Sequence, residues 1–388
     1  MLNHVYMVLW MLILVSLSAF VFSSKKFSII DKVDKRDLNN IDALRGILAL
    51  MVVFHHYMYN YFLWKKGDWT IDGYNVFLSI GPFAVCVFFI LSGYLFSSTG
   101  TKNTDQWLSF YKKRIFRIIP VCLVSSLLCI TISYILGHKS FSELSSIAYW
   151  LDGGVFNLRP DLFGFSGSNL INAGVTWTLH WEWLLYASLP FISIIVPKKS
   201  MLTVSLIVAA LSIPSYIAVK LSTHNVELAN SFKYILCFSF GYISRYLNNT
   251  RVIQLLTSRK SLSFILLVTA AIFVAGKGYS FYTSILAFLI FFNVLNGFSF
   301  FGILQNSGLR RIGVVSYSIY LIHGVCWFTC FQFMTEKTNI LLASTLTFLV
   351  VIILSTIISL MIEYPCYNIV KRPKKVTSNE ISPDNKLA

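Results

Sequence analysis

Long apolar runs dominate this sequence of 388 residues and constrain its fold more than any other feature. The first run covers residues 5–22, and ten more follow at about 44–63, 76–97, 118–136, 175–196, 201–219, 230–247, 262–275, 281–297, 313–334 and 341–362. A transmembrane helix needs about 20 mostly apolar residues to cross a bilayer core. Because 56% of the residues are apolar and 12% are charged, a soluble domain would expose large apolar patches. The sequence therefore predicts an all-α, polytopic bundle of transmembrane helices.

The positions of Lys and Arg predict the orientation of this bundle. If the chain crosses the membrane at every run, one set of alternate loops and span ends holds 24 of the 32 Lys and Arg residues. Cytoplasmic loops carry the positive excess in membrane proteins, so we expect the N-terminus outside and the C-terminus in the cytoplasm. Membrane topology thus accounts for the net charge of +16, and no nucleic-acid partner is expected. A cleaved signal peptide is the alternative for residues 5–22.

Three further features bear on organisation. The seven cysteines lie almost all inside apolar runs and form no Cys-x-x-Cys pair, which indicates core residues rather than disulfides or a metal site. The longest predicted outer loop, 137–173, is a lid, an acceptor-binding element or a plain connector. The polar tail 373–388 is predicted to be disordered.

Ionisable residues inside membrane spans are costly and mark functional sites by default. Arg45 and His56 are 11 residues apart, which places them on one helix face about 16 Å apart along the axis. Asp42, three residues before Arg45, is positioned to pair with it. His55 lies about 100° away from this face and is expected to be structural.

Ionisable residues of other predicted spans lie at two depths in the membrane. Glu182 and His323 fall near the depth of His56 when each helix is started at its predicted membrane boundary, so the three groups are expected in one layer. Arg114 and Arg117 are three residues apart at the cytoplasmic edge, and two guanidinium groups there suit a polyphosphate. The alternatives are a buried structural histidine and ordinary positive-inside anchors.

Taken together, these segments resemble the acyltransferase-3 family of integral membrane acyltransferases over about residues 41–372. The resemblance rests on Arg45 and His56 in an Arg-x10-His pattern, residues 88–95, Arg114 and Arg117 in Arg-x-x-Arg, Trp177-Thr178-Leu179 with Glu182 and Tyr186, residues 316–323, and Glu363-Tyr364-Pro365. Thr178 stands where the family commonly has Ser, and Gly324 stands near a frequent Pro. The resemblance implies ten conserved spans, with residues 5–22 as one extra N-terminal span.

The resemblance implies transfer of an acyl group, usually acetyl, from cytoplasmic acyl-coenzyme A to a carbohydrate hydroxyl at or beyond the outer leaflet. Acceptors of this kind include lipid-linked glycans, lipopolysaccharide O-antigen and exopolysaccharide. The catalytic residues would be His56 as general base, Glu182 as its orienting carboxylate, and Arg45. Arg45, Arg114 and Arg117 would hold the phosphates of acetyl-CoA. Substrate contacts or structural support would come from Asp42, Ser92, Trp177, Tyr186 and His323, and an acyl-histidine intermediate is an alternative route.

These expectations divide the chain into an extra helix with its linker (1–40), an acyltransferase domain in the bacterial inner or plasma membrane (41–372) and a cytoplasmic tail (373–388). The soluble esterase-like domain of some family members is not found, so a separate extracytoplasmic transferase is an expected partner, beside membrane lipids. A polysaccharide polymerase or ligase, or a glycan flippase, is the alternative function.

Overall fold

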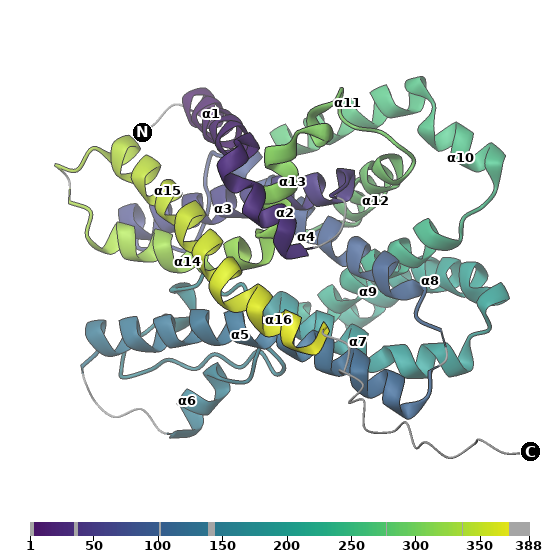
Figure 1. The fold of residues 1–388 in the computed structure, drawn as a ribbon, viewed down its shortest axis with the longest axis horizontal. Helices are drawn as coiled ribbons and strands as arrows, with labels where there is room; N and C mark the ends of the chain where they lie inside the picture. The colour runs from purple at the N-terminus through teal and green to yellow at the C-terminus, as the bar shows by residue number, and fades with distance from the viewer. Residues whose placement is uncertain are drawn as a thin grey trace, which may run out of the picture.

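The computed structural model describes residues 4–34, 38–100, 102–138, 144–276, 278–335 and 337–371, and no β-strand is found in these ranges. The chain folds as an all-α bundle, as predicted (Figure 1). Its helices are α1 (His4–Ser23), α2 (Ile29–Asp34), α3 (Asn40–Lys66), α4 (Asn75–Ser97), α5 (Thr104–Leu136), α6 (Leu144–Trp150), α7 (Trp177–Ile195), α8 (Met201–Thr223), α9 (Val226–Tyr246), α10 (Thr250–Thr257), α11 (Arg259–Ala275), α12 (Phe281–Leu295), α13 (Ser307–Val314), α14 (Ser316–Gln332), α15 (Ile340–Ile358) and α16 (Tyr364–Lys371). A π-helical turn, Ser359–Glu363, joins α15 to α16.

Each of the eleven predicted apolar runs coincides with a helix, namely α1, α3, α4, α5, α7, α8, α9, α11, α12, α14 and α15. Among the described residues, six helices are long and apolar enough to cross a membrane, and the number rises to eight if α10–α11 and α13–α14 each count as one bent span. The protein is therefore a multi-pass membrane protein. Length and composition support fewer straight spans than the eleven predicted, since α12 has only 15 residues and neither α7 nor α9 is apolar enough over a span's length.

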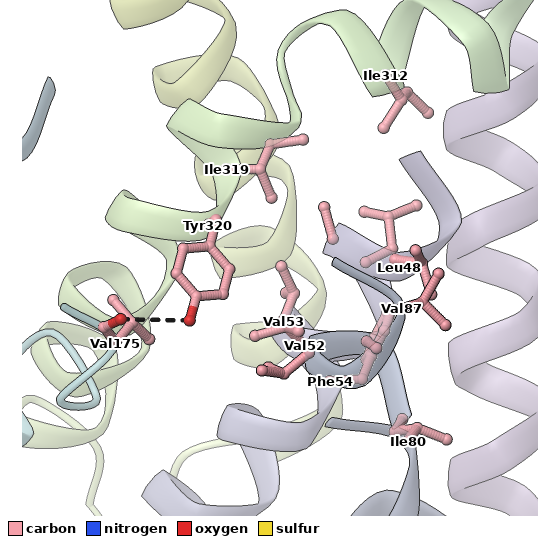
Figure 2. Close-up of a cluster of buried hydrophobic side chains, with 14 of the residues drawn as sticks. Leu48, Val52, Val53, Phe54, Ile80, Val87, Val175, Ile312, Ile319 and Tyr320 are labelled. Carbon is pink, nitrogen blue, oxygen red and sulfur yellow. Dashed lines mark hydrogen bonds between the residues drawn. The ribbon is translucent and has the colours of Figure 1, made fainter. Parts of the chain in front are cut away.

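The bundle is built around α3 and α4. In the most apolar part of α3, 72% of the residues are buried, whereas 17% are buried in α8. Helix α3 packs against α4, α13 and α14, and Figure 2 shows Leu48, Val52 and Phe54 from α3 in this core with Ile80 and Val87 of α4. The central helix that carries Arg45 and His56 is thus enclosed by protein, while α8 presents most of its surface to the surroundings.

The predicted run 313–334 is broken rather than straight. The axes of α13 and α14 differ by 73°, with the break at Val315. The short helix α13 crosses α3 closely, because a Cβ at Gly313 would clash with the carbonyl of Asp42 and a Cβ at Gly46 would clash with that of Leu309. Small residues permit such backbone contact between membrane helices. This crossing fixes the N-terminal end of α3, where Arg45 lies.

The extra N-terminal helix α1 is part of the bundle. It packs along α13 (Figure 1), and the Arg311 guanidinium of α13 donates to the Asp31 carboxylate at 2.7 and 2.9 Å. The same guanidinium donates to the backbone carbonyls of Phe22 and Ser24 at 2.6 and 2.9 Å. A bidentate arginine–carboxylate pair with two added backbone bonds is a strong local anchor.

Candidate active site

A cavity of about 320 Å³ lies among α3, α4, α5, α7, α14 and α16. Its polar lining includes Arg45, Arg114, Arg117, Ser92, Glu182 and Tyr320. This volume is at the lower end of the range for ligand pockets, about 300–1,000 Å³. The structure thus brings the three arginines singled out from the sequence to the wall of one cavity, together with a carboxylate.

Arg45 reaches this cavity from the first turns of α3. Its guanidinium lies 3.7 Å from the Asp42 carboxylate, so the predicted pairing is confirmed. Asp42 is held in place by a capping box, in which Asn39 accepts from the Asp42 backbone N–H and donates its own N–H to the Asp42 carboxylate at 3.0 Å. The helix cap therefore also orients a charge partner for Arg45.

Arg117 forms an ion pair with a buried carboxylate. Its guanidinium lies 2.9 Å from Glu363, which is fully buried. Glu363 also accepts hydrogen bonds from the Ser318 and Ser359 hydroxyls at 2.6 and 2.9 Å. Glu363 closes the π-helical turn that precedes α16, and such turns occur frequently at functional sites. The expected role of Arg117 as a free phosphate ligand is therefore weakened, because an internal anion already balances its charge.

Arg114 differs from Arg117 in its partners. Its guanidinium lies over the rings of Phe96 and Phe110, at 5.2 and 5.7 Å from their centres. Its Nε is buried and has no hydrogen-bond partner among the described residues. Aromatic faces stabilise a cation without neutralising it. Arg114 thus contributes to the cavity wall a positive charge with no direct ion pair in the described ranges, and its hydrogen bond to Tyr186 links it to Glu182.

Glu182 does not contact His56, which corrects the sequence prediction. Its carboxylate accepts hydrogen bonds from the Ser92 hydroxyl of α4 at 3.1 Å and from the Tyr186 hydroxyl at 2.8 Å. Ser92 and Tyr186, both predicted support residues, are thus ligands of this carboxylate. The three side chains form a hydrogen-bonded group on the cavity wall.

The partner of His56 is His323. The His56 Nδ1 lies 2.9 Å from the His323 Nε2, and the His323 Nδ1 lies 3.0 Å from the Ile319 carbonyl oxygen. The two imidazoles join α3 to α14, and His323 is fully buried. His55 turns away and bonds the Phe77 carbonyl at 2.7 Å, in agreement with its predicted structural role.

The depth at which α7 starts explains why Glu182 misses His56. The segment before α7 lies inside the bundle, where the backbone of Asn172 packs directly on Gly324, the residue after His323. Tyr320 then bonds to the Val175 carbonyl at 3.2 Å (Figure 2) and lies 3.0 Å from the Thr178 hydroxyl. Thr178 therefore lies level with Tyr320. Glu182 follows one turn further along α7, about 6 Å beyond that level.

Tyr320 separates the cavity from the histidine pair. Its ring lines the cavity and lies 6.1 Å from the His323 ring. Arg45 lines the same cavity, but His56 does not. The helix face that carries both residues is therefore not lined by one continuous cavity. On its other side His56 stacks on Trp69 of the loop between α3 and α4, with ring centres 6.4 Å apart.

The described part of the long loop, 144–176, is folded against α7. Its Arg159 pairs with Asp152 at 2.9 Å, and both side chains are almost fully buried. The Trp183 indole of α7 donates to the Gly153 carbonyl at 3.0 Å. The described part of the loop is thus an ordered part of the domain, and its contacts hold α7 in place.

Sequence reasoning missed Glu363 as a site member and did not foresee that His323 pairs with His56. It gave His323 a supporting role and cited Glu363 only within a family motif, although both are ionisable residues in apolar runs, which is the signal that found His56. Five of the seven cysteines are buried, as predicted for core residues, while Cys330 and Cys366 are half-buried. Within the described ranges, no cluster of His, Cys, Asp and Glu has the geometry of a metal site.

Fold and site together define a polytopic helical membrane protein with an internal histidine pair beside an arginine-lined cavity. A family model described as "Acyltransferase domain", that of the acyltransferase-3 family, matches residues 38–364, and the chain belongs to this family. An "O-acetyl transferase" of Shigella phage Sf6 is 30% identical over 154 residues, which are 38% of this chain and 44% of that relative. The chain thus aligns with less than half of the relative's length. No solved structure matches the chain.

Proposed function

We propose that this protein is a membrane O-acyltransferase that moves an acyl group, acetyl in the first instance, from acyl-coenzyme A to a carbohydrate hydroxyl. The observation that carries the proposal is the pair formed by His56 and His323 at 2.9 Å. Family membership supports acyl transfer, and the name of the phage relative supports acetyl as the group and oxygen as the acceptor atom.

The hydrogen bonds of the pair define which nitrogen acts as the base. The Ile319 carbonyl can only accept, so the His323 Nδ1 carries a proton and the His323 Nε2 of a neutral ring accepts. His56 then donates through its Nδ1–H and keeps the lone pair on its Nε2. A positioned neutral imidazole with a free nitrogen is a suitable general base near neutral pH.

The reaction uses this nitrogen twice. The His56 Nε2 takes the proton of the acceptor hydroxyl while the hydroxyl oxygen forms a bond to the thioester carbonyl carbon. The carbonyl oxygen then bears the negative charge of a tetrahedral intermediate. When the carbon–sulfur bond breaks, the thiolate of coenzyme A leaves and receives the proton from the His56 Nε2. His323 stabilises the transient imidazolium through the bond from the His56 Nδ1–H, which becomes charge-assisted.

The cavity is proposed as the donor site. Arg114 offers a guanidinium whose Nε has no partner in the described ranges, and Arg45 lies on the same wall. Arginine binds phosphate oxygens bidentately, which suits the diphosphate of coenzyme A. The acyl end of the donor would extend past Tyr320 toward His56. The proposed location is the cell membrane, with this cavity and the C-terminus on the cytoplasmic side, where Lys and Arg are concentrated.

The test uses purified full-length protein in lipid nanodiscs, supplied with radiolabelled acetyl-CoA and a polysaccharide or lipid-linked glycan fraction. Release of free coenzyme A together with label in the glycan is the expected result, and His56→Ala should abolish both. Transfer at an undiminished rate by a well-folded His56→Ala protein would contradict the mechanism. Extension or translocation of the glycan without use of acetyl-CoA would point to a polymerase or a flippase.

A further inference from the structure

Four aromatic side chains meet beside the cavity. Trp177 and Trp181 come from α7, Tyr234 from α9, and Tyr279 from the segment before α12. The ring centres of Trp177 and Trp181 lie 5.1 and 5.0 Å from that of Tyr234, and Trp177 lies 5.8 Å from Tyr279. We name these four side chains the aromatic platform. Phe89, which lines the cavity, lies 5.5 Å from Tyr234, so the platform adjoins the cavity.

The polar groups of the platform lack partners. The indole N–H groups of its two tryptophans and the hydroxyls of its two tyrosines form no hydrogen bond with any residue in the described ranges, and all four side chains are half-buried. The neighbouring Trp183, in contrast, donates its indole N–H to a backbone carbonyl at 3.0 Å. The donor and acceptor atoms of these groups stay accessible, since none of them is among the fully buried polar atoms without a partner. Four accessible hydrogen-bonding groups in one cluster therefore offer a site for a polar ligand.

The platform is held in place by neighbouring groups. The Lys233 ammonium donates to the Tyr279 backbone carbonyl at 3.1 Å and lies 4.7 Å from the ring centre of Tyr216. This contact ties the segment before α12 to α9. Thr178, next to Trp177, lies 3.0 Å from the Tyr320 hydroxyl, which places the Trp177 end of the platform level with Tyr320.

We propose that the aromatic platform binds a pyranose ring of the acceptor, an inference that rests on the function proposed above and specifies its acceptor site. The axial C–H groups of a pyranose carry partial positive charge and pack on the negative faces of aromatic rings. Its hydroxyls exchange hydrogen bonds with the indole N–H and phenol groups. The acceptor is therefore held on the cavity side of Tyr320, beside the proposed donor site, and its hydroxyl would extend past Tyr320 toward His56 as the acyl end of the donor does.

A hydrocarbon chain fits the platform less well. Covering four hydrogen-bonding groups with methylene groups would remove them from water without replacement, at a cost of about 1–3 kcal/mol for each group. A sugar ring supplies both an apolar face and replacement hydroxyls. The composition of the platform therefore favours a carbohydrate over the acyl chain of the donor or a lipid tail.

The experiment measures sugar and donor binding separately. Saturation-transfer difference NMR with methyl β-D-glucopyranoside, methyl β-D-galactopyranoside and methyl α-D-mannopyranoside reports contact of sugar C–H groups with full-length protein in nanodiscs. Titration with acetyl-CoA reports the donor site. The variants are Trp181→Ala, Trp181→Phe and Tyr234→Phe. Trp107→Phe, at a half-buried tryptophan near the start of α5, is the matched control, and thermal unfolding checks that each variant is folded.

Saturation of at least one of the three sugars by the unmodified protein is expected, with binding about tenfold weaker in Trp181→Ala and a smaller loss in the two Phe variants. Acetyl-CoA binding should be unchanged in all of them. No sugar signal in the unmodified protein, or equal signals in the variants, would overturn the proposal. Weaker acetyl-CoA binding in folded platform variants would also overturn it, since the platform would then belong to the donor. Sugar binding without acetyl transfer would support the platform and reject the proposed function. Acetyl transfer to a sugar at an undiminished rate in Trp181→Ala would support the proposed function and reject the platform.

Discussion

The Nδ1 of His56 and the Nε2 of His323 lie 2.9 Å apart, across the contact between α3 and α14. The Ile319 carbonyl fixes the proton on the other nitrogen of His323. The three groups form a chain in which a backbone carbonyl sets the tautomer of one imidazole, which in turn sets the tautomer of the next. A neutral histidine thus occupies the position that the carboxylate holds beside the histidine of a Ser-His-Asp triad.

Replacing His323 should impair catalysis without loss of substrate binding. His323→Ala removes the acceptor for the His56 Nδ1–H, so the ring can rotate or change tautomer, and kcat should fall by about 10²-fold with little change in either KM. His323→Gln keeps a side-chain acceptor and should recover part of the rate. Steady-state kinetics on protein in nanodiscs measures both parameters.

The matched test is the double variant His56→Ala with His323→Ala. If His323 acts through His56, the double variant should be no slower than His56→Ala alone, because residues that act as a unit are not additive. A double variant slower than His56→Ala, with the two losses of rate multiplied, would show that His323 has a separate role.

Mass spectrometry of protein incubated with acetyl-CoA alone should find no acetyl group on His56; an adduct there would favour the acyl-histidine route.

Arg114 and Arg117 should respond differently to substitution, although they share one motif. Arg117→Ala leaves the fully buried Glu363 without its cation, which should destabilise the fold by about 3–5 kcal/mol. Arg114→Ala removes a guanidinium that has no ion pair in the described part of the chain, so it should raise the KM for acetyl-CoA with little change in thermal unfolding. Thermal unfolding and donor kinetics measured on the same samples separate the two effects.

A double variant provides the control for this comparison. Arg117→Met combined with Glu363→Gln removes both charges while Gln still accepts from the two serine hydroxyls, and it should recover much of the stability lost in Arg117→Ala. Equal unfolding temperatures for Arg114→Ala and Arg117→Ala would contradict the assignment of distinct roles.

Much of the helix pattern could be predicted from the sequence, but the layer in which side chains meet could not. Apolar length located the segments that became helices, and intramembrane charge located His56, Glu182 and His323. Helical depth was counted from an assumed membrane boundary, and the segment before α7 starts deeper because Asn172 packs on Gly324. Such long-range backbone contacts leave no periodic signal in the sequence. The buried pairing of Arg117 with Glu363 joins residues 246 positions apart and was missed for the same reason.

This backbone contact also makes a prediction about α7. A Cβ at Gly324 would clash with the backbone of Asn172, which cannot turn aside as a side chain does. Gly324→Ala should therefore push the start of α7 away from α14. We expect both a lower rate of acetyl transfer and a lower unfolding temperature, although no predicted catalytic side chain is altered. Gly100→Ala is the matched control, because its new Cβ would meet only the Lys198 side chain. Normal kinetics in Gly324→Ala would show that the depth of α7 does not matter for transfer.

The last prediction concerns the Tyr320 ring, which lines the cavity and lies 6.1 Å from His323. Tyr320→Ala should open a passage between the cavity and the histidine pair, and water that reaches His56 can then attack the thioester in place of a sugar hydroxyl. We expect faster hydrolysis of acetyl-CoA without acceptor, measured as free thiol release, and lost again when His56→Ala is added. Tyr320→Phe keeps the ring and should stay near the unmodified rate, as should Tyr134→Ala at an exposed site on α5. Unchanged hydrolysis in Tyr320→Ala would mean that the ring is no barrier between donor and base.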